Sequence, residues 1–341
     1  MEYPSLACFL SHAPVTRARA VRLSGMTPDS MPDLAVVFDA LRPRLFGIAY
    51  RMLGVVADAE EVVQEAFLRR SQAEASPRSD EAWLVSVTTR LAVDRLRRAA
   101  TERAAYAGQW LPEPVAAHPP DRGAELADDL SFAFLLLLER LAPEERAAFL
   151  LREVFGADYA EVARTLGKGE AACRQLVHRA KERVRRDRRR FAAAPDARER
   201  GARRFAEALR AEDRDGVLAL LADDALLVAD GGGRVPALGE AQQGAARVAQ
   251  LLVGFERANR VWLERRAAPA PAYEFAWLNG QPAVLTLLAD RLLFATVLDL
   301  DGEPHGEPRV AGLYRVMNLA KLARLGRPTV LGPGETLGDR R

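Results

Sequence analysis

A glycine turn between two helical segments is the feature of this sequence that most restricts its fold. In the shorter segment the apolar residues recur at helical spacing, as Tyr159, Val162, Ala163 and Leu166. Gly167-Lys168-Gly169 follows as a tight turn. The apolar face of the longer segment is formed by Cys173, Leu176, Val177, Ala180 and Val184. A short helix, a glycine turn and a longer helix together predict a helix-turn-helix.

The outer face of the longer helix carries side chains that suit contact with nucleic acid. Arg and Gln are able to make bidentate contacts to guanine and adenine edges in the major groove. Residues 168–191 contain ten basic and three acidic side chains, a net charge of +7, whereas the whole chain carries only +2. The turn, the periodicity and the charge together predict a DNA-binding helix with a phosphate-neutralising extension; a structural bundle with a solvated basic face is the alternative. The candidate DNA contacts are Glu170, Arg174, Gln175, His178, Arg179 and Lys181.

Upstream, the chain is predicted to be helical from Leu34 to about Arg103. Asp58 and Glu61 resemble a capping box, in which Asp58 accepts from the first-turn amides and Glu61 reaches back. The polar face of the helix that begins here is most simply a solvated surface. A docking site for another protein is the more specific interpretation. Its residues are Asp58, Glu61, Gln64, Glu65 and, as one apolar member, Leu68.

A loop at 76–80 with Pro77 precedes a second upstream helix at 81–98. The side chains of Arg90, Arg97 and Arg98 would be able to follow a nucleic-acid backbone. Trp83 is expected in the core more often than as a platform for an unpaired base.

Residues 106–126 are rich in proline, which removes amide donors and disfavours regular helix, and they are predicted to be a linker. Trp110 and Leu111 are unusual in a plain tether and indicate that the linker docks on another part of the protein. We predict six segments: a disordered extension at 1–31, then 32–105, the linker at 106–126, 127–191, 197–327 and a tail at 328–341. The protein is expected to start at Met1, Met26 or Met31.

After Pro195 the pattern changes to one typical of an α+β domain. Helices are predicted at 197–221 (two) and 239–255, and strands at 225–229, 261–267, 273–278, 283–288, 292–300 and 310–316. Asn279-Gly280 and Asp301-Gly302 are strong hairpin signals. The loop Asp230-Gly-Gly-Gly-Arg234 lacks the Lys-Ser/Thr of a phosphate-binding loop, so a turn at a strand end is expected.

Several functional classes are excluded by composition. The longest apolar run, Phe132–Leu138, is about a third of the ~20 residues that a membrane span needs, and no secretory signal is present, so a cytoplasmic protein is expected. Cys8 and Cys173 are too few for a disulfide framework, and the four histidines are isolated. No metal, cofactor or catalytic residue is predicted.

These features together resemble the bacterial extracytoplasmic-function sigma factors, over residues 32 to about 325. The matching strings are AYRMLG at 49–54, ADAEEVVQEAF at 57–67, TRLAVDRL at 89–96 and EAACRQLV at 170–177. The linker string WLPEPV at 110–115 and the loop DGGGR at 230–234 resemble a subgroup with a fused C-terminal SnoaL-like domain. In this chain Arg234 replaces the usual Lys, and NLAKL at 318–322 lacks the Pro-Asp pair of the subgroup's NPDKL string.

The resemblance implies a multidomain fold: two all-α sigma regions, the second with the helix-turn-helix, followed by an α+β SnoaL-like cone with a curved antiparallel sheet and a pocket. It implies that Asp58, Glu61, Gln64, Glu65 and Leu68 dock on core RNA polymerase. It also assigns promoter −10 contacts to Ser76, Pro77, Asp80, Trp83, Arg90, Asp94, Arg97 and Arg98, and −35 contacts to the outer face of the longer helix.

For the C-terminal domain the resemblance implies a regulator built into the chain. The regulatory positions would be Trp110, Leu111, Pro112, Glu113, Pro114, Asp230, Gly231, Gly232, Gly233, Arg234, Asn318, Lys321 and Leu322. The expected partners are core RNA polymerase, promoter DNA and an unidentified small ligand, with no membrane and no separate anti-sigma factor. The alternatives are a one-component DNA-binding regulator that senses a ligand and a SnoaL-like enzyme fused to a DNA-binding module; the absence of an evident acid–base pair counts against the enzyme.

Overall fold

The computed structural model describes residues 31–73, 77–116, 130–187, 194–302 and 307–325. The chain forms two compact units. The helical unit contains the described residues up to Ala104 and from Leu137 to Asp187, and the sheet unit contains the described residues of 105–136 and 194–325. The predicted N-terminal extension, apart from Met31, and the predicted tail lie outside the described residues.

The helical unit, together with the helix at its boundary, contains eight helical segments, and Leu45, Met52 and Leu84 are among its buried side chains. Only the part of α4 from Leu137 on belongs to this unit. In chain order the segments are α1 (Met31–Leu53), α2 (Val56–Ser71), α3 (Asp80–Ala104), α4 (Phe132–Glu139), α5 (Pro143–Phe149), a π-helical turn (Leu150–Val154), α6 (Tyr159–Leu166) and α7 (Glu170–Asp187).

The capping box predicted at Asp58 is wrong, because α2 begins two residues earlier, after the extended Val55. Asp58 therefore lies in the first turn of the helix, and its carboxylate accepts a hydrogen bond from Arg95 Nη2 at 2.8 Å. A capping box does start α6. Asp158 accepts from the backbone nitrogen of Glu161 at 2.7 Å, and the Glu161 carboxylate accepts from the nitrogen of Asp158 at 3.0 Å.

The sheet unit is built on a six-stranded mixed sheet with strand order β2-β1-β6-β5-β4-β3. Neighbouring strands are antiparallel except β1 and β6, which are parallel, so the expectation of an antiparallel sheet is wrong for this one pair. Its strands are β1 (Leu221–Asp230), β2 (Gln242–Gln243), β3 (Ala272–Leu278), β4 (Gln281–Leu288), β5 (Arg291–Asp301) and β6 (Arg309–Val316).

The strand predicted at 261–267 is wrong, because residues up to Arg265 continue helix α10 (Ala245–Arg265). Val261 and Trp262 suggested a strand by residue type, but Phe255, Asn259 and Leu263 are buried at intervals of four residues, which is a helical face. The helix also starts later than the predicted residue 239. The other helices of the unit are α8 (Pro195–Arg210), α9 (Arg214–Leu220) and α11 (Leu319–Leu322).

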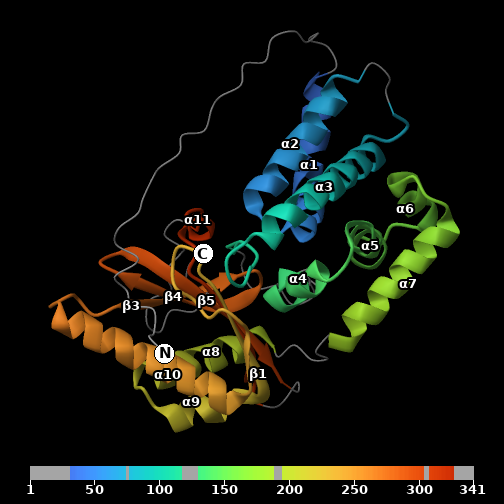
Figure 1. Cartoon of the computed structure of the whole chain (residues 1–341). Coiled ribbons are helices and arrows are strands. Elements are labelled where there is room, and N and C mark those ends of the chain that lie inside the picture. Colours follow the sequence, from blue (N-terminus) through green and yellow to red (C-terminus); the bar gives the residue numbers. More distant parts are fainter. Residues whose placement is uncertain (1–30, 74–76, 117–129, 188–193, 303–306, 326–341) are drawn as a thin grey trace. The chain divides into compact units, whose positions relative to one another are not determined.

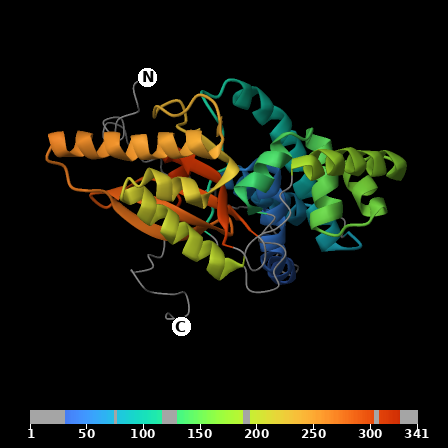
Figure 2. The ribbon, with the colours of Figure 1, turned by 90° about the horizontal axis from the view of Figure 1, so that it is seen from below.

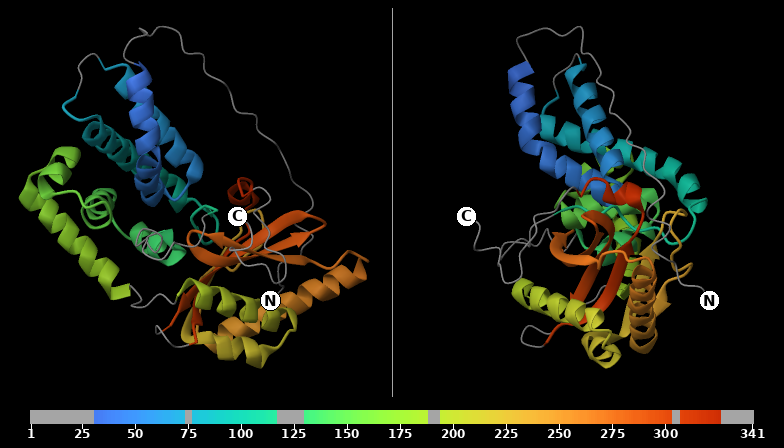
Figure 3. Two further views of the ribbon diagram at one scale, coloured as in Figure 1. Left: turned by 180° about the vertical axis from the view of Figure 1, so that it is seen from behind. Right: turned by 90° about the vertical axis from the view of Figure 1, so that its left-hand side faces the viewer.

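The sheet buries both of its faces, and β4 has no exposed residue. Helices α8, α9 and α10 cover one face, as Figures 1 and 2 show, and they pack against Leu298 and Leu313. The other face packs against Leu111, against Phe132 at the start of α4, and against Leu322 of α11. The segments on both sides of residues 117–129 thus complete the hydrophobic core of the sheet unit. Figure 3 shows α11 on the side of the sheet opposite α8.

No helix within the described ranges has both the length and the apolar character needed to cross a membrane.

Candidate functional site

Helix α7 presents an exposed face that carries all six residues predicted to contact DNA. Its opposite face is buried through Cys173, Val177 and Ala180, which pack in the core of the helical unit. Gly167 ends α6 with φ at 63°, a backbone conformation that favours glycine. The helix-turn-helix therefore has the geometry that its sequence predicts.

The side chains on this face differ in how much they are engaged within the chain. Gln175 and His178 have no hydrogen bond or ion pair in the described part of the protein. Arg174 pairs with Glu170 at 2.8 Å, and Lys181 pairs with Glu153 at 2.7 Å. Arg179 donates to the buried carboxylate of Glu145 at 2.9 Å, so part of its role is to hold α7 on α5.

Helix α3 carries most of the predicted −10 residues. Arg90, Asp94, Arg97 and Arg98 are exposed, and Trp83 is half-buried. Arg90 donates to the carbonyl oxygens of Thr165 and Arg164, at 2.6 and 2.7 Å, and Arg97 pairs with Glu144 at 2.6 Å. Two of the predicted DNA contacts are therefore bound to α5 and α6 in the free chain.

The loop before α3 is described from Pro77 onward, and Ser76 lies outside the described residues. Pro77 is half-buried. The Asp80 carboxylate pairs with Arg70 Nε at 2.5 Å and so ties the start of α3 to the end of α2.

On α2, the predicted polymerase-docking residues lie on one side of the helix. Glu61 and Gln64 are exposed, whereas Leu68 is half-buried. Glu65 pairs with Arg69 at 2.8 Å along the same helix, a surface pair that adds little stability.

The carboxylate of Asp230, at the end of β1, is the centre of a polar cluster in the sheet unit. It is fully buried and accepts hydrogen bonds from Tyr106 Oη at 2.6 Å and from the backbone nitrogen of Leu111 at 3.0 Å. Lys321 Nζ, from α11, forms an ion pair with it at 2.6 Å and also donates to the carbonyl oxygen of Leu111. Asn318 Nδ2 donates to Tyr106 Oη at 2.9 Å. We call Tyr106, Leu111, Asp230, Asn318 and Lys321 the linker clamp.

Aromatic rings enclose the cation of the clamp. The Lys321 ammonium lies 4.5 Å from the ring centroid of Trp110 and 5.0 Å from that of Tyr106. Burial and the hydrogen bond to Asp230 raise the pKa of the Tyr106 hydroxyl, so this group stays protonated and donates. The charges of Asp230 and Lys321 thus compensate each other inside the protein.

The glycine loop after β1 is shaped for close approach to the clamp. Gly232 has φ at 63° and donates its backbone N–H to the Asp230 carboxylate at 2.9 Å. A Cβ atom there would lie 2.5 Å from Asn318 Nδ2, and one on Gly231 would lie 1.9 Å from the Val235 carbonyl oxygen. A Cβ atom on Gly233 would lie 2.9 Å from the Cβ atom of Ala107, whereas Arg234 is exposed.

The remaining regulatory positions extend the clamp along the linker. Pro112, Glu113 and Pro114 are buried, and Glu113 pairs with Arg324 at 3.7 Å. Lys321 and Asn318 make their contacts although this chain lacks the Pro-Asp pair between them.

Sequence reasoning missed a second group of linker contacts at the β3–β4 hairpin. Asn279 accepts from the backbone nitrogen of Val115 and donates its own N–H to the Val115 carbonyl, both at 2.8 Å, while Gln281 accepts from Phe132 N at 2.9 Å. Asn279 was recognised only as a turn residue, and nothing local marks its buried side chain as a binding group. Val115 and Phe132, which lie on opposite sides of residues 117–129 in the chain, are therefore held at one hairpin.

Comparison with known families matches both parts of the helical unit. The family described as Sigma-70 region 2 matches residues 37–102, and the family described as Sigma-70, region 4 matches residues 131–184. The residues predicted to contact the −10 element and the polymerase fall in the first match, and the helix-turn-helix falls in the second.

Individual relatives extend the similarity to the sheet unit. The ECF RNA polymerase sigma factor SigJ of Mycobacterium tuberculosis is 38% identical over 283 residues, 81% of this chain and 86% of SigJ. The crystal structure of SigJ aligns with a TM-score of 0.65 over 85% of this chain and 98% of that chain. A probable ECF sigma factor of the same organism, SigI, is 32% identical over 79% of this chain and 89% of SigI. The predicted order of two helical sigma regions and a C-terminal α+β body is thereby confirmed.

Proposed function

The chain belongs to the extracytoplasmic-function RNA polymerase sigma factors, and we propose that its sheet unit regulates promoter use through the linker clamp. As a sigma factor it binds core RNA polymerase and promoter DNA and initiates transcription. A one-component regulator is not favoured, because both sigma regions match their families.

The Asp230 carboxylate is the single observation that carries the regulatory proposal. This one group binds a hydroxyl of the linker, a backbone amide of the linker and an ammonium of α11, while it is fully buried. The linker joins the region that reads the −10 element to the region that reads the −35 element. A linker held at fixed points restricts how far apart these regions can lie on DNA, and the restriction sets the promoter spacing.

We further propose that the exposed faces of α7, α3 and α2 carry the −35, −10 and polymerase contacts, respectively. The contacts of Arg90 with the carbonyls of Thr165 and Arg164 support a free form in which the −10 face is partly engaged. Promoter binding would then exchange these carbonyl acceptors for phosphate oxygens, which bind the guanidinium more strongly.

The experiment is transcription in vitro with core RNA polymerase on a promoter selected by the wild-type factor, rebuilt with spacers one and two base pairs shorter and longer. We expect the wild type to show a sharp spacer optimum. Asp230→Asn and Trp110→Ala are expected to reduce the preference for that spacer by about tenfold, the equivalent of ~1.4 kcal/mol.

Asp223→Asn is the matched control, since Asp223 lies on the same strand and its side chain is fully exposed. It should leave the spacer preference unchanged. Core binding, measured separately by pull-down, should be retained by all three variants. Unchanged spacer profiles for both Asp230→Asn and Trp110→Ala would refute the clamp proposal while leaving the sigma-factor activity established.

Three further predictions belong to the same proposal. The sheet unit acts as a regulator and not as an enzyme, and the protein works in the cytoplasm. No separate anti-sigma factor is required, although a relative, RpoE of Bartonella quintana, is seen in complex with the anti-sigma factor NepR. Purified factor and core polymerase alone should therefore show the spacer-dependent regulation.

A further inference from the structure

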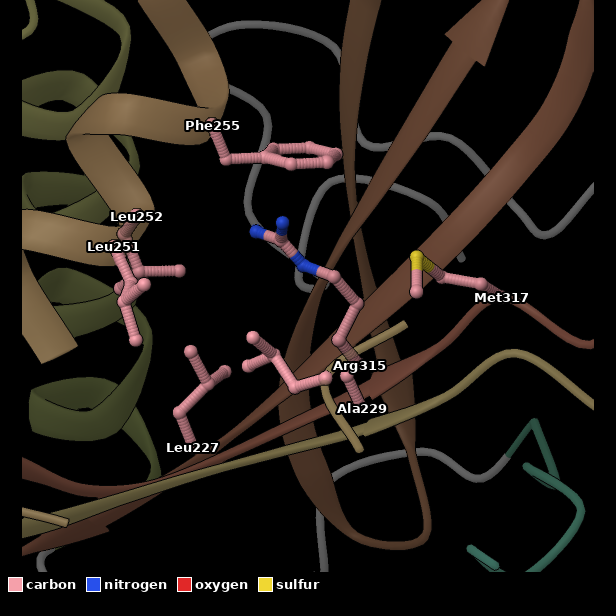
Figure 4. A pocket seen from close by; sticks show the side chains of 8 residues that line it. Leu227, Ala229, Leu251, Leu252, Phe255, Arg315 and Met317 are labelled. Atoms are coloured by element: carbon pink, nitrogen blue, oxygen red, sulfur yellow. The ribbon is translucent and has the colours of Figure 1, made fainter. Parts of the chain in front are cut away.

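A small cavity lies inside the sheet unit between α10 and strands β1 and β6 (Figure 4). Its volume is about 50 Å³, which is room for several water-sized groups. Seven of its eight lining residues are apolar: Leu227, Ala229, Leu238, Leu251, Leu252, Phe255 and Met317. The eighth is Arg315, whose guanidinium projects from β6 toward Phe255.

Arg315 is a buried cation that lacks a paired anion in the described part of the chain. Its side chain is 5% exposed, and Nε donates to the Thr296 hydroxyl at 3.2 Å. The guanidinium carbon lies 4.7 Å from the ring centroids of both Phe255 and Phe294. Neither terminal nitrogen has a hydrogen bond or an ion pair within the described residues.

Glu256, an acid that acts on Arg315 electrostatically, does not neutralise this charge by direct contact. Glu256 attracts Arg315 electrostatically, yet no ion pair within 4.0 Å joins them, and its carboxylate instead accepts from Tyr273 Oη at 2.8 Å. Burial lowers the pKa of Arg315 and raises the pKa of Glu256, so both charged forms are disfavoured where they lie. A buried charge is costly unless it is paired and hydrogen-bonded, so an external anion would be stabilised beside Arg315.

We propose that this cavity binds a small organic carboxylate, with the anion on the free nitrogens of Arg315 and a short apolar chain against the leucines. Two guanidinium N–H groups match the two oxygens of a carboxylate. The seven apolar residues leave no further donors for the additional oxygens of phosphate or sulfate. The volume limits the apolar part to a few carbon atoms.

This inference concerns binding only and is independent of the proposed role of the linker clamp. The cavity is nevertheless adjacent to the clamp in the chain, because Ala229 precedes Asp230 and Met317 precedes Asn318. A negative result in the transcription experiment would refute the clamp proposal and leave the binding proposal untouched. A negative result in the binding experiment would do the reverse.

The test is an NMR titration of the full-length chain labelled with ¹³C at its methionine methyl groups, with sodium propionate as the probe. Met317 lines the cavity, and its signal is assigned with Met317→Leu; Met52, buried in the helical unit, is the internal reference. We expect a saturable shift of Met317 alone, with a Kd of about 1 mM for a ligand of this size. Neutral propionamide and sodium chloride should cause no saturable shift.

Two variants remove the site in different ways. Arg315→Gln keeps a partner for Thr296 and should weaken propionate binding at least tenfold, while Ala229→Leu fills the cavity and should abolish it. Arg309→Gln, at the exposed start of the same strand, should bind like the wild type. A narrow, well-dispersed Met317 signal verifies that the sheet unit of each variant is folded, and the Met52 signal verifies the same for the helical unit. The proposal is overturned if Met317 does not respond, if propionamide acts like propionate, or if folded Arg315→Gln binds as the wild type does.

Discussion

Asp230 and Arg315 are two buried charges on neighbouring parallel strands, and they differ in how many groups of the protein compensate them. Asp230 pairs in register with Val316, and Arg315 pairs with Ala229, so the two charges are one position apart. Asp230 receives two hydrogen bonds from the linker, one from its own loop and an ion pair from Lys321. Within the described residues, Arg315 has one hydrogen bond, to the hydroxyl of Thr296, and its guanidinium lies beside the rings of Phe255 and Phe294.

The difference follows from the two faces of the sheet. Successive side chains of a strand point to opposite faces, so neighbouring positions send these charges in opposite directions. On the face of Asp230 the linker and α11 cover the sheet, and together they supply the compensating groups. On the face of Arg315 the helices leave a cavity with apolar walls. The Asp230 carboxylate thus holds the linker on the sheet, and the Arg315 guanidinium is the group that would bind the proposed ligand.

The largest expected effect is on Asp230. Asp230→Asn removes the carboxylate that pairs with the buried ammonium of Lys321 at 2.6 Å, and removing one partner of such a pair costs about 3–5 kcal/mol of stability. Scanning calorimetry of the full-length chain should show the loss in the transition of the sheet unit.

Arg315→Gln provides the contrast, because it removes a charge that has no ion-pair partner among the described residues, and its cost should stay below about 1 kcal/mol. The double variant Asp230→Asn/Lys321→Met should recover part of the loss, since both charges of the Asp230–Lys321 pair are then removed together. Equal losses for Asp230→Asn and Arg315→Gln would show that the two sites do not differ as described.

The helix-turn-helix could be predicted from sequence because its determinants are local. Gly167, the apolar period and the basic face all lie within about thirty residues. The clamp has no such local signal, because Asp230 is 124 residues from Tyr106 and 91 from Lys321. Only the family resemblance indicated that Asp230 and Lys321 act with the linker, and the role of Tyr106 was not predicted.

Arg315 was missed for a different reason. A single arginine in the apolar run 310–316 is the only local signal, and strand alternation does not reveal whether a charge faces solvent or a cavity. The mixed sheet was missed similarly, since the pairing of β1 with β6 joins segments that are far apart in sequence.

A smaller effect is expected at the glycine loop that shapes the clamp. Gly232→Ala puts a Cβ atom 2.5 Å from Asn318 Nδ2 at a residue with positive φ, and should cost about 1–3 kcal/mol. Gly239→Ala is the matched control, since a Cβ there has nothing within 4 Å. Urea unfolding followed by tryptophan fluorescence measures both; a control as unstable as Gly232→Ala would argue against the close approach as the cause.

The smallest expected effect is a pH dependence on the Arg315 side of the sheet. Burial raises the pKa of Glu256 in the folded protein above its ordinary value of 4.5, against the attraction of Arg315 and the hydrogen bond from Tyr273, while Glu212 adds to the rise. As pH rises above 4.5 the unfolded chain releases this proton first, so the folded state loses stability until its own, higher pKa is passed. The slope from one group is at most about 1.4 kcal/mol per pH unit.

Glu256→Gln should therefore flatten the stability profile between pH 4.5 and 7.5, measured by urea unfolding at each pH. Arg315→Gln should steepen it, because removing the cation raises the pKa of Glu256 further. The opposite changes expected for Glu256→Gln and Arg315→Gln would show that Arg315 stabilises the charged form of Glu256. If Arg315→Gln left the profile unchanged, Glu256 would not act as a partial counter-charge, and Arg315 would be compensated even less than its contacts indicate.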